Sequence, residues 1–271
     1  MKLSTNKKCR YVICGTILLC IFVLVGLIGY RFLLHEKVQN NRISALEGEI
    51  SFLKAEESLP SMEWDDDNFN YLAIGNSITL HDKTSYWWNE CGMAATTLEN
   101  DYVHQLSQLL KEQVQDNVVP FAYNFYAWEV QSNDRNETLS LMDGLLSDKI
   151  DLVTIQLSEN AVDLATFESD YEEMIRYIQS RATKAKIIVI GDFWDENQKD
   201  LMKREACENC GVDFVSLDSI KDQEKYMCGS GTAVMDENGE KHIVEHDGVA
   251  RHPNDEGMKK IAEKVFDSFR K

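Results

Sequence analysis

Beyond residue 70, five short apolar runs alternate with longer amphipathic segments. The runs are rich in Val, Ile and Leu, as buried strands of parallel sheets are, and they cover 71–75, 118–123, 150–157, 186–192 and 212–217. Apolar residues recur at helical spacing near 98–115, 137–147, 167–182, 197–209 and 254–270. Such alternation predicts an α/β fold, in which helices cover both faces of a parallel sheet through right-handed crossovers.

The N-terminal part has a different pattern. Residues 11–34 contain an uncharged stretch that ends at Tyr30, and its roughly 20 residues, at about 1.5 Å each, would span a bilayer core. The basic residues before it are Lys2, Lys7, Lys8 and Arg10. No cleavage site follows, so we expect an uncleaved signal anchor, with residues 1–10 in the cytoplasm and the body outside the cell.

A polar segment, 35–69, separates this anchor from the predicted sheet. Its apolar residues Ile43, Leu46, Ile50 and Leu53 are spaced by three, four and three. This stripe indicates a short helical stalk of about two heptads, which could pair with a second copy of the chain. The acidic run 64–67 that follows is interpreted as linker, and the catalytic body is assigned to 70–271.

Charge and cysteine content narrow the possible partners. The net charge is −18, and the first 35 residues contain no acid, so the body is strongly acidic and nucleic-acid binding is not expected. Four cysteines lie beyond the anchor, and three pairings are open to them: Cys91, Cys207, Cys210 and Cys228. A structural disulfide or free thiols fit the single C-x-x-C pair better than a redox or metal site.

One strand runs directly into candidate chemistry. In the segment 71–79, apolar residues give way to Gly75, Asn76 and Ser77, which places Ser77 at the carboxyl end of a strand, where ligands bind in open α/β sheets. Ser77 could be a nucleophile whose backbone N–H contributes to an oxyanion hole. It could equally be the N-cap of a helix.

Two distant segments favour the nucleophile. The strand 151–157 is followed by Ser158-Glu159-Asn160, and the sequence His252-Pro253-Asn254 precedes the last helix. Together with Gly75-Asn76-Ser77-Ile78-Thr79, these blocks resemble those of the SGNH/GDSL hydrolase superfamily, over about residues 70–271. The resemblance implies a flavodoxin-like three-layer α/β/α sandwich with a five-stranded parallel sheet.

The resemblance also implies roles for individual residues. Ser77 would attack an acyl carbonyl, and His252 would accept its proton and later protonate the leaving alcohol. Asn160 would donate its side-chain amide to the oxyanion beside the Ser77 backbone N–H. Without the resemblance, a helix N-cap would be the simpler interpretation of Asn160.

Two features depart from the pattern of the superfamily. The segment 124–129 lacks the usual Gly, so a backbone N–H near Ala127 is the candidate third oxyanion donor, while Trp128 and Glu129 could line the substrate pocket. Val249 occupies the usual position of the acid, and Asp247 lies five residues before His252. Asp247 is slightly favoured as the residue that orients His252. A backbone carbonyl, which would leave a Ser–His dyad, is the alternative.

Aromatic residues and cofactors complete the expectations. Trp87 and Trp88 follow Ser77 in a predicted loop and are candidate substrate contacts, although a buried lid is an equally good interpretation; Trp194 is ambiguous in the same way. No HExxH motif or comparable cluster accompanies His246, so neither a metal nor another cofactor is expected.

These observations define one leading function and two alternatives. The leading hypothesis is an outward-facing, membrane-anchored serine esterase that hydrolyses O-acyl esters, with carbohydrate O-acetyl groups as the expected substrate. The first alternative is an O-acyltransferase that uses the same serine on a surface polysaccharide. The second alternative is a non-catalytic glycan-binding scaffold on a degenerate hydrolase fold.

Overall fold

The computed structural model describes residues 29–31, 59–131, 135–194 and 197–271. By its internal contacts the chain divides into two units, Met1–Glu47 and Gly48–Lys271. The predicted anchor lies outside the described residues except for 29–31, which are helical, and the stalk stripe lies wholly outside them. No helix in the described ranges is both long and apolar enough to cross a membrane. The anchor, the stalk and the homodimer therefore stay predictions.

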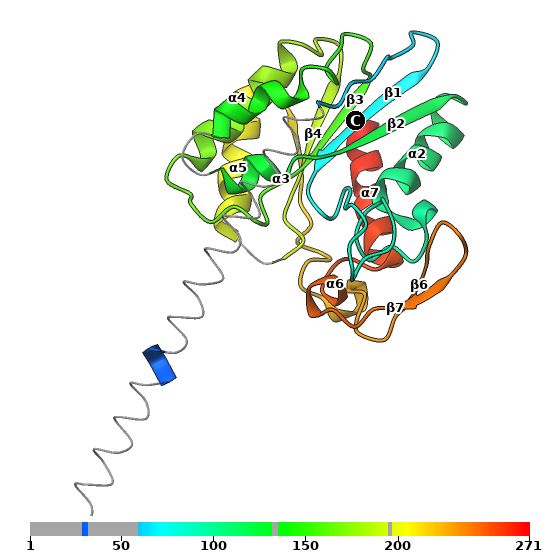
Figure 1. Cartoon of the computed structure of the whole chain (residues 1–271). Coiled ribbons are helices and arrows are strands. Elements are labelled where there is room, and N and C mark those ends of the chain that lie inside the picture. Colours follow the sequence, from blue (N-terminus) through cyan, green and yellow to red (C-terminus); the bar gives the residue numbers. More distant parts are fainter. Residues whose placement is uncertain (1–28, 32–58, 132–134, 195–196) are drawn as a thin grey trace, which may run out of the picture. The chain divides into compact units, whose positions relative to one another are not determined.

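A five-stranded sheet forms the centre of the second unit, and all of its neighbouring strands are parallel (Figure 1). The strand order is β2-β1-β3-β4-β5. The strands are β1 (Phe69–Gly75), β2 (Val118–Asn124), β3 (Leu152–Gln156), β4 (Lys186–Ile190) and β5 (Asp213–Val215). Each lies within two residues of its predicted bounds. The predicted α/β fold with a five-stranded parallel sheet is confirmed.

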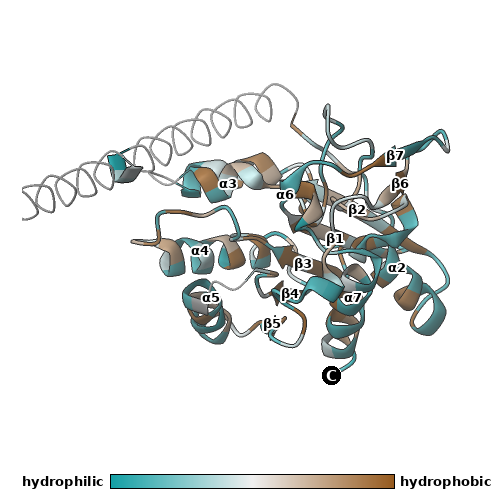
Figure 2. Ribbon diagram, turned by 90° about the horizontal axis from the view of Figure 1, so that it is seen from below, coloured by the Kyte–Doolittle hydropathy of each residue, from teal (hydrophilic) through white to brown (hydrophobic). Residues whose placement is uncertain are grey.

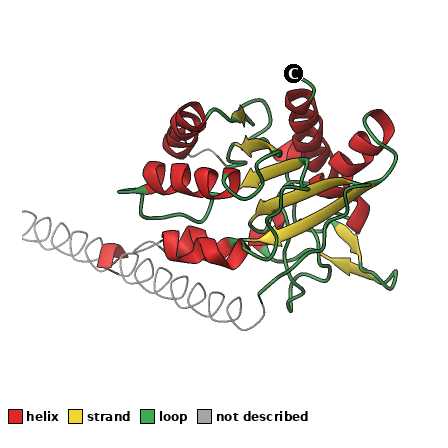
Figure 3. Cartoon of the chain, turned by 90° about the horizontal axis from the view of Figure 1, so that it is seen from above, coloured by secondary structure: helices red, strands yellow, loops and turns green. Residues whose placement is uncertain are grey.

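Helices lie on both faces of this sheet (Figure 3). They are α2 (Tyr102–Gln113), α3 (Tyr126–Val130), α4 (Phe167–Gln179), α5 (Asn197–Cys210), α6 (Asp247–Ala250) and α7 (Asp255–Phe269). Three 3₁₀ segments accompany them: η1 (Leu98–Asn100), η2 (Arg135–Met142) and η3 (Glu224–Tyr226). The helix expected at 137–147 is thus the 3₁₀ segment η2, and the short helix α3 was not predicted.

Alternation along the strands divides the core into two layers. On β1, Tyr71 and Ala73 pack with residues of α2 and α7, whereas Leu72 and Ile74 pack with residues of α3, η2, α4 and α5. Successive side chains of a strand point to opposite faces, so both faces need apolar residues. This is why the central strands are largely apolar, with brown stretches such as β3 in Figure 2, although Asn70, Thr154 and Gln156 are buried polar residues on these strands.

A third apolar cluster lies outside the sandwich. It joins the loop after Ser77 to an antiparallel hairpin, β6 (Ala233–Met235) and β7 (Lys241–Ile243), and to α6. Its buried members are Trp87, Cys91, Met93, Ala94, Ala95, Val234, Val244 and Val249. Strands of three residues carry too little alternation to be recognised in a sequence. The hairpin was accordingly not predicted.

The segment before β1 is packed against the body. Trp64 is buried, contacts Phe121 edge-on at 6.4 Å between ring centroids, and donates its indole N–H to the Leu145 carbonyl at 2.7 Å. The interpretation of residues 64–67 as linker is therefore wrong for Trp64. An indole buried with its N–H satisfied fastens this segment to the domain.

Candidate active site

The end of β1 positions Ser77 in a tight turn. The N–H groups of Thr79 and Leu80 both donate to the Asn76 carbonyl at 2.9 Å, and the Ile78 N–H donates to Asn76 Oδ1 at 3.1 Å. The next helix, α2, begins only at Tyr102. Ser77 is therefore not a helix N-cap. Within the described residues its backbone N–H donates no hydrogen bond, so it remains available to a ligand.

The loop before α7 brings His252 to this serine. Ser77 Oγ and His252 Nε2 are 2.8 Å apart, and His252 Nδ1 is 2.7 Å from the Gly248 carbonyl oxygen. A carbonyl oxygen can only accept, so the proton lies on Nδ1 and the lone pair on Nε2. His252 therefore accepts the hydrogen bond from the Ser77 hydroxyl. This is the arrangement that a general base needs in order to activate a nucleophile.

Asp247 does not orient the imidazole. The only ring N–H of neutral His252 is taken by the Gly248 carbonyl, and the Asp247 side chain is exposed at the start of α6. The preference for Asp247 is thus wrong, because the short helix places a backbone carbonyl where a carboxylate was expected. The geometry is that of the Ser–His dyad.

The surroundings keep His252 neutral. Burial lowers the pKa of His252 to about 4, against a hydrogen bond to the Gly248 carbonyl that favours the charged form, and the charges of His81, Arg251 and His246 lower it further. Trp194 packs edge-on against the imidazole with ring centroids 5.1 Å apart, and its indole donates to the Arg251 carbonyl at 3.2 Å. Trp194 thus forms a wall beside His252, and whether it contacts substrate stays a prediction.

Asn160 lies on the neighbouring loop, after β3. Its side-chain Nδ2 donates to Glu129 Oε2 at 2.7 Å, which uses one of its two N–H bonds. Helix α4 begins only at Phe167, with Thr166 as its N-cap, so Asn160 caps no helix. The roles of Asn160 and of the Ser77 backbone N–H as oxyanion donors stay predictions.

The segment after β2 differs from expectation. Trp128 is fully buried against Phe167 and Tyr171, so it does not line a substrate pocket. Glu129 is fully buried as well and binds the loops around Asn76 and Asn160 instead. Both substrate-contact assignments are wrong, because α3 turns these side chains inward. Ala127 lies in the first turn of α3, and its role as the third oxyanion donor stays a prediction.

Further titratable groups lie around these loops: Glu159 is half-buried, and Asp192, Asp200 and Lys203 are buried. Burial, with the nearby Asp192 charge, raises the pKa of Glu159 to about 8. Glu159 Oε2 accepts from Asn76 Nδ2 at 2.7 Å. Burial lowers the pKa of Lys203, but the carboxylates of Asp192, 2.5 Å away, and Asp200 outweigh it and raise that pKa. The site is supported by a paired ionic network rather than by apolar packing alone.

The aromatic residues of the loop after Ser77 have separate roles. Trp87 is fully buried in the third apolar cluster, so its place in this structure is in the core of that cluster. Trp88 is half-buried, stacks on His242 at 4.5 Å between ring centroids, and lines a surface hollow of about 270 Å³. Trp87 also borders this hollow, but of the pair only Trp88 has an exposed surface.

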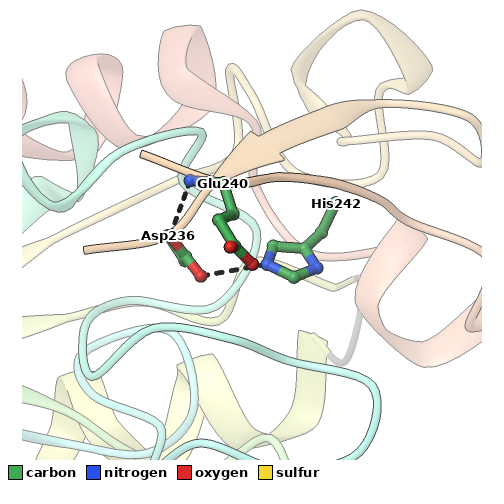
Figure 4. Close-up of side chains that lie close together, drawn as sticks. All are labelled: Asp236, Glu240 and His242. Atoms are coloured by element: carbon green, nitrogen blue, oxygen red, sulfur yellow. Dashed lines mark hydrogen bonds and ion pairs between the residues drawn. The ribbon is translucent and has the colours of Figure 1, made fainter. Parts of the chain in front are cut away.

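The described residues contain one group of side chains with metal-ligand character. Asp236, Glu240 and His242 converge at the β6–β7 hairpin (Figure 4). Asp236 Oδ2 pairs with His242 Nε2 at 3.1 Å, and Asp236 Oδ1 accepts the Glu240 N–H at 2.8 Å. These contacts stabilise the turn. We assign no metal to the group, and the absence of a cofactor stays a prediction.

The cysteines in the described part of the chain are all free thiols: Cys91, Cys207, Cys210 and Cys228. Burial raises the pKa of the Cys207 thiol to about 12, and it also raises that of Cys210. Thiols with raised pKa values are poor nucleophiles. The free-thiol interpretation of the C-x-x-C pair is confirmed.

Comparisons with known proteins concern the fold. No family model matches the chain, and no curated protein is significantly similar to it in sequence. A solved two-domain esterase active on acetylated mannans is similar, with a TM-score of 0.49 and 16% identity, over 75% of this chain and 48% of that chain. This chain thus spans about half the length of that enzyme.

Two further solved structures are similar over nearly their whole length. A family 3 carbohydrate esterase from Clostridium thermocellum has a TM-score of 0.48 and 15% identity, over 75% of this chain and 98% of its own. An extracellular lipase from Streptomyces rimosus has a TM-score of 0.46 and 13% identity, over 74% of this chain and 99% of its own. The chemistry proposed below rests on the geometry of Ser77 and His252.

Proposed function

We propose that this chain is a serine esterase with a Ser77–His252 dyad. The observation that carries the proposal is the polarised chain of hydrogen bonds from Ser77 Oγ through His252 to the Gly248 carbonyl. Its direction leaves His252 Nε2 as the acceptor of the serine proton. A non-catalytic scaffold would have no need for this alignment inside a buried site.

The reaction follows from these groups. Ser77 Oγ attacks the acyl carbonyl while its proton moves to His252 Nε2, and the Gly248 carbonyl stabilises the resulting imidazolium. The Ser77 N–H and Asn160 Nδ2 donate to the oxyanion. His252 then protonates the leaving alcohol oxygen, which releases the alcohol and leaves an acyl-serine. Water, deprotonated by His252, attacks that ester and frees the acid and Ser77.

We further propose an extracytoplasmic location and an O-acetylated carbohydrate as substrate. The location rests on the apolar segment 11–34 with its basic N-terminal flank. Aromatic rings near the site, those of Trp194 and Tyr86, suit a sugar, because apolar sugar faces pack on aromatic rings. Tyr86 is exposed and stacks on His246 at 4.3 Å between ring centroids.

The test is hydrolysis by the full-length chain in detergent. Parent protein, Ser77→Ala and His252→Ala are incubated with p-nitrophenyl acetate and a panel of acetylated glycans, with and without unacetylated acceptor glycan. We expect acetate release by the parent alone. Transfer to the acceptor in preference to water would favour the acyltransferase. Full activity in either variant, or none in folded parent, would refute the esterase assignment.

A further inference from the structure

Glu129 is a charged side chain with no exposed surface, yet it lies beside the proposed site. It belongs to α3, whose neighbouring residues pack in the layer that contains α4 and α5. A carboxylate is rarely buried this completely unless hydrogen bonds or a charge compensate its lost hydration. The hydrogen-bond partners of Glu129 therefore explain why a carboxylate can be buried here.

Every recorded partner of Glu129 is an N–H donor. Glu129 Oε1 accepts from Asn76 Nδ2 at 3.0 Å, from the Ser158 backbone N–H at 2.6 Å and from the Asn160 backbone N–H at 3.4 Å. Its Oε2 accepts from Asn160 Nδ2 at 2.7 Å. Burial raises the pKa of Glu129, and these donors counteract the shift. Both oxygens act as acceptors, as in an ionised carboxylate.

These donors come from the two loops that carry the proposed chemistry. Asn76 directly precedes the nucleophile, and Asn160 supplies the oxyanion amide. The paired ends of β1 and β3, Gly75 and Gln156, bring the two loops together. Among the described residues, Glu129 hydrogen-bonds both loops from a third segment, α3, in addition to the direct hydrogen bond between Asn76 and Glu159.

One of the tethered residues has an unusual backbone. Ser158 has φ of 139°, a region that side chains other than Gly rarely occupy. Its N–H is held by Glu129, its hydroxyl donates to Asp192, and its carbonyl accepts from Lys199 Nζ at 2.8 Å. Such a conformation persists only where surrounding contacts enforce it. Glu129 supplies one of those contacts. It thereby holds Ser158, which lies two residues before Asn160.

We propose that Glu129 is a positioning residue, which holds the Asn160 amide in register with Ser77 by fastening the two loops to one buried carboxylate. The inference rests on the proposed esterase function. Glu129 contacts neither Ser77 nor His252 in the recorded hydrogen bonds of the described residues, so it takes no part in the chemical step itself. Because Glu129 accepts one N–H of the Asn160 side-chain amide, the orientation of the planar amide is fixed, and so is the direction of its second N–H.

The diagnostic variant is Glu129→Gln. The Gln side chain keeps the size of Glu and one acceptor oxygen, but an NH₂ group replaces the other oxygen. This NH₂ donor would face either Asn160 Nδ2 or the N–H groups that now donate to Oε1, and two donors cannot form a hydrogen bond with each other. We expect kcat for p-nitrophenyl acetate to fall by about 10- to 100-fold, at most what loss of an oxyanion donor costs, with KM changed less than about threefold. Unchanged kcat would refute the proposal.

A matched control comes from the same layer. Asp170 is also a buried carboxylate; it pairs with Arg135 at 2.9 Å and accepts from Thr166 Oγ1 at 2.7 Å. Asp170→Asn should lower the melting temperature while kcat stays within about twofold of the parent, because no partner of Asp170 belongs to the site. Equal kcat losses in the two variants would show that Glu129 acts only through general stability.

A double-mutant cycle tests whether Glu129 acts through Asn160. Glu129→Gln and Asn160→Ala are combined and kcat is measured for all four proteins. Once the Asn160 amide is absent, removing the Glu129 carboxylate should lower kcat less than it does in the parent. The fold-loss of kcat in the double variant should therefore be at least about threefold smaller than the product of the two single fold-losses. Losses that simply multiply would overturn the proposal.

Labelling of Ser77 by a fluorophosphonate separates this inference from the esterase assignment. The label needs the dyad and the oxyanion donors but no particular substrate, so Glu129→Gln should slow it about as much as it lowers kcat. If the parent is labelled yet hydrolyses no ester, the esterase proposal fails while the labelling rates still decide the role of Glu129. If the parent is not labelled, both proposals fail.

Discussion

His252 donates its Nδ1–H to the carbonyl oxygen of Gly248 at 2.7 Å, so a backbone group occupies the place of a triad carboxylate. A neutral carbonyl fixes the tautomer as an acid would. It stabilises the imidazolium less, because it carries no full charge. The dyad is accordingly a weaker base, in keeping with the depressed pKa of His252.

The first prediction concerns Asp247. Asp247→Asn should leave kcat/KM within about threefold of the parent, whereas the same change in a working triad costs about 10⁴-fold in kcat. The reason is that the Asp247 side chain is exposed while Gly248 holds the imidazole. Steady-state kinetics at neutral pH provide the check, with His252→Ala as the inactive reference. A fall in kcat/KM of two or more orders of magnitude would show that Asp247 orients His252 in a catalytic triad.

The second prediction concerns pH. Catalysis needs neutral His252, whose pKa in the folded protein is about 4. The unfolded value is about 6.5. The acid limb of kcat/KM should therefore fall near pH 4, and activity should be level from about pH 5.5 to neutral. A pH–rate profile in constant ionic strength measures it. An acid limb near 6.5 would contradict a buried, neutral imidazole.

The lowered pKa of His252 also determines how the stability of the fold changes with pH. Between its folded and unfolded pKa values His252 binds more protons in the unfolded chain, so its contribution to stability falls as the pH drops from about 6.5 to 4. Urea midpoints for parent and His252→Ala should converge as the pH drops through this window. An acid-induced loss of stability that is equal in both proteins would exclude His252 as its source.

The sequence was a good guide to the sheet and to the dyad. Largely apolar strands are visible because both faces of a parallel sheet are buried, and a serine after such a strand lies where ligands bind in open α/β sheets. Ser77 was therefore a candidate from its place at a strand end, whereas His252 was assigned through the resemblance of its block to that of the SGNH/GDSL superfamily. Their contact itself joins residues 175 positions apart, and only the fold brings them together.

Other parts of the site could not be read from the sequence. Whether Asp247 or Gly248 meets His252 depends on the four-residue helix α6, which is too short to show a period. Trp128 and Glu129 were candidate pocket residues because their segment follows the second strand, where the superfamily pattern places an oxyanion donor. The helix α3 buries both of them. No signal in the sequence pointed to this burial, because Glu is among the residue types that are most often exposed.

The third prediction concerns Asn160. Asn160→Ala removes a donor to the oxyanion, which typically costs about 10²- to 10³-fold in kcat with little change in substrate affinity. Asn160→Asp tests the same point with size preserved, because a carboxylate beside Glu129 would repel both Glu129 and the oxyanion. Both variants should be slow, and kcat and KM should be measured separately. A pure rise in KM would indicate a substrate contact instead.

The last prediction concerns Gly75, two residues before the nucleophile. A Cβ at this position would overlap the side chain of Thr79 and lie 2.8 Å from the Gln156 carbonyl oxygen of the neighbouring strand. The backbone of β3 cannot move aside without disturbing the loop that follows it, so Gly75→Ala should destabilise the fold by about 1–3 kcal/mol or more. Urea unfolding of the variant measures this, and its kcat should fall as well because Ser77 and Asn160 lie on the two strand ends that are pushed apart. An unchanged unfolding midpoint with full activity would mean that the turn tolerates a side chain there, and that the close approach of β1 and β3 does not set the geometry of the site.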